Sequence, residues 1–186
     1  MMESTHSSNT LSAPMAIIAI GSSAGGLEAI RTILTMLPSG KNAAVVILQH
    51  HDPHHHHLLS DILDQSARVP VRTIADRMPI EADHIFIPPP GQHLCIEQGL
   101  FKQREIEDPQ SPVPSIDAFL ISLAKSEHHR GVAIILSGKG SDGACGIREF
   151  KASGGIIIAQ SPESAKFSEM PRAALATGCV DLMLTP

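Results

Sequence analysis

Apolar residues in this chain gather in short runs that are separated by stretches with helical spacing. Seven runs are rich in β-branched residues, and several are apolar on both faces of a strand. Strands of that kind are typical of a parallel sheet buried between two layers of helices. The pattern therefore predicts an α/β fold, with a doubly wound, mostly parallel sheet flanked by helices. The predicted strands cover residues 15–21, 43–49, 69–74, 84–88, 131–138, 155–160 and 180–184.

The first predicted helix carries apolar side chains at steps of three and four residues. Leu27, Ile30, Leu34 and Leu37 share this stripe, so we expect it to face the core. Pro38 is expected to stop the helix, because proline cannot donate the next backbone hydrogen bond.

Capping residues mark the remaining helices. Asp52 is expected to cap a helix that has Pro53 at its first position, and Pro114 or Ser115 begins the next one. A later helix, within residues 141–155, ends on paired glycines. The buried side of the second helix is predicted to comprise Leu58, Leu59, Ile62 and Leu63.

Two segments fall outside this alternation of strands and helices. Residues 92–104 alternate around Gly99 and predict a small antiparallel hairpin at one edge of the sheet. Residues 1–14 are polar, which predicts a flexible lead-in to one domain over residues 15–186.

Composition narrows the classes of function. The 186 residues are 42% hydrophobic and 18% charged, as in an ordinary globular protein, and no run approaches the roughly 18 apolar residues of a membrane span. The net charge of -5 and the absence of Trp and Tyr disfavour nucleic-acid binding. Cys95, Cys145 and Cys179 have neither disulfide nor zinc spacing, which favours a reducing, cytoplasmic setting.

Three polar residues follow predicted strands directly. Ser23, His50 and Asp142 stand where the carboxyl ends of parallel strands meet, which is where open α/β sheets bind ligands. Each has a plain alternative: Ser22 or Ser23 as a helix cap, His50 as a solvated loop residue, and Asp142 as the cap of the helix after it.

Together, these residues are the side chains of a nucleophilic triad. A serine hydroxyl becomes a nucleophile when an imidazole takes its proton, and a carboxylate fixes the tautomer of that imidazole. Residues 21–25 also fit G-x-S-x-G, a sharp turn that presents its serine. The chain order Ser, His, Asp differs from that of the α/β-hydrolases, so this match does not predict their fold.

Ordered motifs over about residues 15–184 resemble the catalytic domain of CheB-type protein-glutamate methylesterases. In that family the nucleophile, base and aspartate stand in motifs that correspond here to "IGSSAGG" with Ser23, "LQHHDP" with His50 and "SGKGSDG" with Asp142. Four further stretches look alike. They are "HIFIPPPGQHL", "PSIDAFLISLA", "GGIIIAQ" and "MPRAALATG".

The resemblance implies hydrolysis of γ-glutamyl methyl esters on chemoreceptors, with release of methanol, and in some relatives deamidation of glutamine. Methyl-accepting receptors are the implied partners, together with a separate methyltransferase or response regulator. No metal or organic cofactor is needed. Backbone amides near Ala24 and around Lys139 to Gly140 are the candidates for an oxyanion hole.

The chain departs from the family pattern in three ways. Only fourteen residues precede the first predicted strand, so we expect no receiver domain in cis. Lys139 replaces the usual Met or Thr and could pair with Asp142, which would weaken the support of His50. Val113 stands where the family often has Arg. The alternative function is therefore a catalytically impaired receptor-docking or sensory-complex module on the same scaffold.

The sequence disfavours two other kinds of site. Nucleotide binding at the glycine-rich turn is disfavoured because G-x-G-x-x-G and the P-loop lysine are both absent. The run "HHDPHHHH" places His54 and His57 at i and i+3, but no acidic or cysteine partner has matching spacing. We therefore predict no physiological metal.

Overall fold

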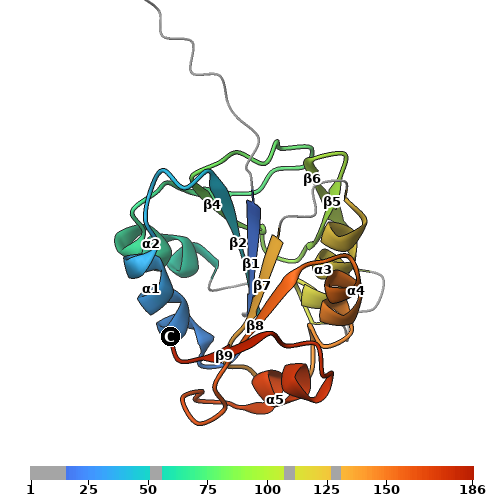
Figure 1. The fold of residues 1–186 in the computed structure, drawn as a ribbon. Coiled ribbons are helices and arrows are strands. Elements are labelled where there is room, and N and C mark those ends of the chain that lie inside the picture. Colours follow the sequence, from blue (N-terminus) through green and yellow to red (C-terminus); the bar gives the residue numbers. More distant parts are fainter. Residues whose placement is uncertain (1–15, 51–55, 107–111, 127–130) are drawn as a thin grey trace, which may run out of the picture.

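A seven-stranded parallel sheet forms the centre of the molecule in a computed structural model, which describes residues 16–50, 56–106, 112–126 and 131–186. The strand order is β3-β4-β2-β1-β7-β8-β9, and every neighbouring pair is parallel (Figure 1). The predicted doubly wound sheet is thereby confirmed. The strands are β1 (Ala16–Ser22), β2 (Ala43–Gln49), β3 (Val71–Thr73), β4 (His84–Ile87), β7 (Gly131–Ile135), β8 (Ile156–Gln160) and β9 (Leu182–Leu184).

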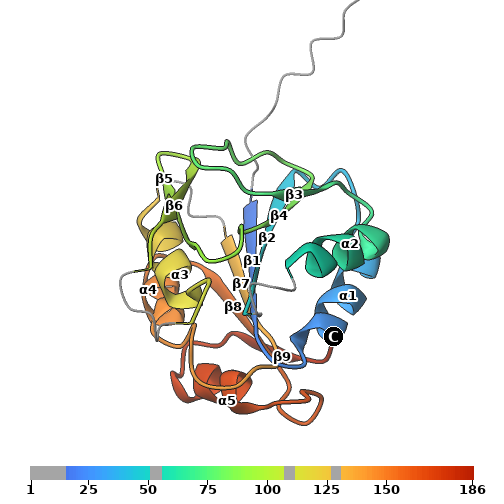
Figure 2. The same cartoon turned by 180° about the vertical axis from the view of Figure 1, so that it is seen from behind.

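Helices cover both faces of this sheet. α1 (Gly26–Met36) and α2 (His56–Ser66) lie on one side, and α3 (Ile116–Lys125) and α4 (Gly146–Ala152) lie on the other (Figures 1 and 2). α5 (Glu169–Ala176) packs near the ends of β7 and β8. Each face has its own hydrophobic cluster, because strands apolar on both faces contribute side chains to both layers.

The predicted apolar stripes face these clusters. Ile30 and Leu34 of α1 are buried, and α1 ends at Met36, two residues before Pro38. Leu59 and Leu63 of α2 are buried as well. Asp52 and Pro53, and the predicted lead-in of residues 1–14, lie outside the described residues.

The predicted hairpin exists as β5 (His93–Glu97) and β6 (Leu100–Arg104). It forms a separate two-stranded sheet, and β5 packs beside α3, where the Ile96 amide donates to Ser122 Oγ at 2.9 Å (Figure 2). An isolated antiparallel β-bridge joins Leu100 to Pro79, and the Phe101 amide donates to the Met78 carbonyl at 2.9 Å. Within the described residues, no helix has the length and apolar composition that a membrane crossing requires.

The order of the strands creates a switch point beside β1. The chain runs from β1 to β2 on one side and later enters β7 on the other side. Loops leaving the carboxyl ends of β1 and β7 therefore diverge, and open α/β sheets bind their ligands at such switch points. Ser23 and His50 directly follow β1 and β2, and Asp142 lies in the loop after β7.

Candidate active site

The main chain brings Ser23 and His50 next to each other. Ser22 pairs with Gln49 in the parallel register of β1 and β2, and the His50 amide donates to the Ser22 carbonyl at 2.9 Å. Ser23 and His50 are therefore the first residues beyond two hydrogen-bonded strands. Both side chains retain partial access to solvent, as residues that meet a substrate must.

The turn after Ser23 has no room for larger residues. Gly25 has a φ of 73°, in the left-handed region, and serves as the N-cap of α1. A Cβ atom on Gly26 would lie 2.5 Å from the Ser22 Cβ. The two glycines of the motif therefore have a steric role, because they allow the chain to turn sharply from β1 into α1.

Buried polar side chains fix the backbone of this turn. The Gln49 amide nitrogen donates to the carbonyls of Ser23 at 2.8 Å and of His50 at 2.9 Å, and its oxygen accepts from the Ser22 hydroxyl. Ser137 lies on the other side, where its carbonyl accepts from the Ser23 amide at 3.0 Å. Its hydroxyl donates to the Ala24 carbonyl at 2.9 Å.

Sequence reasoning missed Gln49 and Ser137 as positioning residues. The signal available was a polar residue at the end of an otherwise apolar strand, which fits Gln49 at the end of β2. Ser137 follows β7 by two residues and is 1% exposed. Buried polar groups of this kind are kept only when they are hydrogen-bonded, so their partners identify their role.

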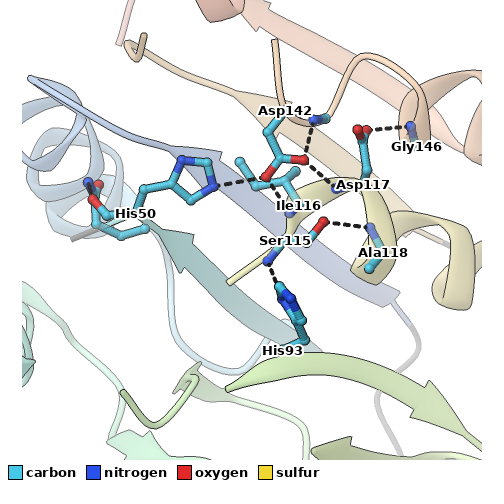
Figure 3. Close-up of polar contacts among 10 residues, drawn as sticks. His50, His93, Ser115, Ile116, Asp117, Ala118, Asp142 and Gly146 are labelled. Atoms are coloured by element: carbon cyan, nitrogen blue, oxygen red, sulfur yellow. Dashed lines mark hydrogen bonds and ion pairs between the residues drawn. The ribbon is translucent and has the colours of Figure 1, made fainter. Parts of the chain in front are cut away.

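Asp142 meets the His50 ring from the other side. Its Oδ2 lies 2.9 Å from His50 Nε2 (Figure 3). The same carboxylate accepts from the amides of Ile116 at 2.8 Å and Asp117 at 3.0 Å, the first two residues of α3, and from Gly143 at 3.0 Å (Figure 3). The carboxylate thus sits at a helix N-terminus, which favours negative charge.

Opposing effects act on the pKa of Asp142. Burial raises the pKa, but the hydrogen bonds from His50, Ile116 and Asp117 outweigh burial and hold it below the ordinary range of an aspartate. Asp142 is therefore ionised at neutral pH and accepts a hydrogen bond from the His50 ring. Nε2 of His50 must carry that proton, which leaves the lone pair of Nδ1 as the base.

The Ser23 hydroxyl makes no hydrogen bond to the His50 ring within the described residues. Such bonds are often long without substrate and shorten when a substrate binds. The structure thus joins His50 to Asp142 through their side chains, and it places Ser23 beside His50 through the backbone bond from His50 to Ser22 and the Gln49 side chain.

Asp142 does not cap α4, the helix that follows it, as the alternative interpretation of Asp142 predicted. α4 begins at Gly146 with Cys145 as its N-cap, and the Asp117 carboxylate accepts from the Gly146 amide at 2.6 Å (Figure 3). Burial raises the pKa of Asp117, and the Asp142 charge raises it further against the hydrogen bonds from Gly146 and Gly143. The Asp142 carboxylate therefore accepts from amides at the start of α3, and the Asp117 carboxylate accepts from an amide at the start of α4. Ser115 is the N-cap of α3, as one of the two predictions had it.

Some amides near Ser23 are already engaged. The Gly140 amide, one of the predicted oxyanion donors, donates to Glu169 Oε2 at 2.9 Å. It is therefore not free to bind an oxyanion in this structure. The Gly138 amide donates to the Phe167 carbonyl at 3.0 Å. The amides of Ala24 and Lys139 make no hydrogen bond within the described part of the chain, so they remain the candidates.

Lys139 does not contact Asp142 as an ion pair in the described residues. Its ammonium lies 5.2 Å from the centre of the Phe167 ring. As for metals, the described residues contain no group of three or more His, Cys, Asp or Glu side chains that could hold an ion. His54 and the His57 side chain lie outside the description, so the expected absence of a metal stays a prediction.

Comparisons with known proteins agree on one family. Residues 18–186 match the family described as CheB methylesterase. A protein-glutamate methylesterase/protein-glutamine glutaminase of Geobacillus kaustophilus is 37% identical over 174 residues, covering 91% of this chain. One from Moorella thermoacetica is 34% identical over 184 residues and 90% of this chain. The chain spans 50% and 41% of the lengths of these two relatives.

A solved structure resembles this fold closely. The crystal structure of the Thermotoga maritima CheB methylesterase catalytic domain superposes with a TM-score of 0.85 at 28% sequence identity. The superposition covers 91% of this chain and 92% of the Thermotoga chain. The sheet order and the helix layers are therefore those of a known catalytic domain.

Proposed function

This chain belongs to the CheB methylesterase family, and on that premise we propose that it hydrolyses glutamate γ-methyl esters on proteins. Methylated chemoreceptors are the proposed substrates, in the cytoplasm. The single observation that best supports a working enzyme is the bond between His50 and the ionised Asp142 at the carboxyl edge of the sheet, beside the turn that carries Ser23. An impaired docking module would not need that hydrogen-bonded pair.

Acyl transfer begins at Ser23. Nδ1 of His50 takes the proton of the Ser23 hydroxyl while Oγ bonds to the ester carbonyl carbon, which places negative charge on the carbonyl oxygen. His50 then gives the proton to the methoxy oxygen, the carbon–oxygen bond breaks, and methanol leaves. Water repeats the sequence on the acyl-enzyme, which releases a glutamate carboxylate and restores Ser23.

The remaining groups act by position. Asp142 orients the His50 ring and stabilises its positive charge during each proton transfer. The amides of Ala24 and Lys139 are the proposed donors to the oxyanion, where losing one donor costs about 3 kcal/mol of barrier stabilisation. By the same route an amide substrate would release ammonia, which is the glutaminase reaction in the names of the relatives.

Methanol release from a methylated receptor fragment tests this proposal. The wild type should release methanol, and Ser23→Ala should lose that release while keeping its unfolding midpoint, because a partly exposed hydroxyl adds little to the core. Ser161→Ala is a matched control, since that serine lies after β8 and contacts none of the three proposed catalytic residues. Methanol release that persists in Ser23→Ala removes Ser23 from the mechanism. Receptor binding without any release by the wild type favours the docking module.

A further inference from the structure

Lys139 is a charged residue that the proposed reaction does not use through its side chain. It follows Gly138, on which a Cβ atom would lie 2.8 Å from the Ser23 Cβ. The side chain of Lys139 is exposed and extends over the Phe167 ring, with 5.2 Å from its nitrogen to the ring centre. Gly138 thus packs directly against Ser23, and the cation belongs to the next residue in the chain.

A second lysine packs against the same turn. The stem of Lys166 lies against Gly25, on which a Cβ atom would come within 2.8 Å of the Lys166 Cβ and 3.1 Å of the Phe167 ring. Phe167 itself is fixed, because Ser137 Oγ accepts from its amide at 3.0 Å and its carbonyl accepts from Gly138. We call Lys139, Lys166 and Phe167 the cationic rim.

The charges of the rim are not neutralised by ion pairs. Within the described residues, no carboxylate forms an ion pair with Lys139 or Lys166. Two acidic residues lie nearby along the chain, and each has a hydrogen-bond partner of its own. Glu169 accepts from the Gly140 amide at 2.9 Å, and Glu163 accepts from the Ser161 hydroxyl.

We propose that the cationic rim binds a carboxylate of the protein substrate next to the ester that is cleaved. This inference rests on the proposed function and adds a preference for methyl esters with acidic neighbours. The Phe167 ring holds the Lys139 ammonium beside the turn and leaves it available to an anion, because cation–π contacts at exposed sites are weak. An anion that approaches Ser23 can therefore draw the ammonium away from the ring.

The overall charge of the chain makes this local arrangement useful. The net charge is -5, so an acidic substrate segment would be repelled from most of the surface. Two lysines beside the turn that carries Ser23 supply attraction where the ester must arrive. Exposed ion pairs are worth little individually, so each lysine should change recognition only about two- to fivefold.

Two synthetic peptides test the inference. Both carry one glutamate γ-methyl ester, and the neighbouring positions are glutamate in one peptide and glutamine in the other. The readout is the ratio of their kcat/KM values, since this ratio cancels any effect on the shared chemistry. The wild type should prefer the acidic peptide. Lys139→Met and Lys166→Met should each lower the ratio about two- to fivefold. Raising the salt concentration should lower it in the wild type, and by a smaller factor in each of these two variants.

Lys41→Met is the matched control. Lys41 precedes β2, at the opposite end of the strands from Ser23, and its loss changes the net charge by the same amount. The ratio should stay at the wild-type value in this variant. An equal ratio in wild type, Lys139→Met and Lys166→Met overturns the rim, and so does an equal decrease in Lys41→Met.

Failure of the rim can be told apart from failure of the proposed function. If the wild type cleaves neither peptide, the proposed hydrolysis is wrong. Binding of both fluorescent peptides to Ser23→Ala and to the double variant Ser23→Ala with Lys139→Met, measured by anisotropy, then tests the rim without turnover. Tighter binding of the acidic peptide that depends on Lys139 supports the rim, and equal binding of both peptides rejects it.

Discussion

The nucleophile side and the acid side of the candidate site are held in place by different means. On the nucleophile side, neutral buried side chains such as Gln49 and Ser137 bond to the backbone around Ser23. On the acid side, the functional carboxylate of Asp142 is itself the bonded group, and backbone amides of α3 surround it. One side positions a hydroxyl indirectly, and the other positions a charge directly.

This difference separates geometry from electrostatics. Neutral hydrogen bonds to the backbone do not depend on pH near neutrality, so changes on the nucleophile side should alter geometry and therefore kcat. The acid side depends on a charge whose pKa is lowered by its partners, so changes there should alter both activity and the pH dependence of stability. Three variants test this distinction.

The largest effect is expected for Asp142→Asn on hydrolysis. An asparagine cannot stabilise the positive charge of His50, and its amide can present the wrong partner to Nε2, which disturbs the tautomer. The loss in kcat should be about 10⁴-fold at neutral pH, as in other triads. Steady-state hydrolysis of a methyl ester peptide measures it. A loss below tenfold would show that Asp142 does not act through His50.

A smaller loss is expected for Gln49→Leu. The leucine leaves the carbonyls of Ser23 and His50 without their buried donor, and a displacement of about 1 Å at the nucleophile can cost about 100-fold in rate. We expect kcat to fall about 10- to 100-fold with little change in KM.

Gln160→Leu is the control for this variant. Gln160 ends β8 as Gln49 ends β2, and the two residues are 4% and 7% exposed. Gln160 bonds to the Ser137 amide and to Ser164 but not to Ser23 or His50. Urea unfolding should show a similar loss of stability in both variants, with a clearly larger loss of kcat in Gln49→Leu. Equal losses of kcat would assign Gln49 a structural role alone.

The smallest effect concerns stability at acid pH. Because the pKa of Asp142 is lowered by folding, its ionised form stabilises the protein above its unfolded pKa, and this contribution is lost as pH falls through the folded pKa. Asp142→Asn should therefore be less stable than wild type at pH 7, by about 1–3 kcal/mol for a buried charged hydrogen bond. Urea unfolding at several pH values should show the difference shrinking toward acid pH. A difference that grows on acidification contradicts the lowered pKa.

Much of the fold could be predicted because burial leaves a simple pattern in the sequence. β2 has the predicted bounds of 43–49, since a strand buried on both faces is apolar until it ends. The placement of Ser23, His50 and Asp142 at one edge follows from strand exits alone, while their catalytic roles stay a prediction. β9 shows the limit, because its predicted run exists but Leu182, Met183 and Leu184 are half-exposed at the sheet edge.

The contacts of the site could not be predicted in the same way. Asp142 precedes α4 in sequence, so a local pattern favours it as the cap of α4, whereas its oxygens bond to α3, which begins 26 residues earlier. Sequence spacing does not rank a local cap against a remote one. The partners of Ser137 and the position of Lys139 over Phe167 also depend on loops that the fold brings together.

Covalent labelling of the protein with a fluorophosphonate tests the central claim most directly. The probe phosphonylates a serine that a neighbouring base activates, and fluoride leaves. Mass spectrometry of digested wild type should locate one adduct on Ser23, and labelling should be far slower in His50→Gln and in Asp142→Asn. An adduct on another serine, or an unchanged labelling rate in His50→Gln, would contradict a Ser23 nucleophile that is activated by His50.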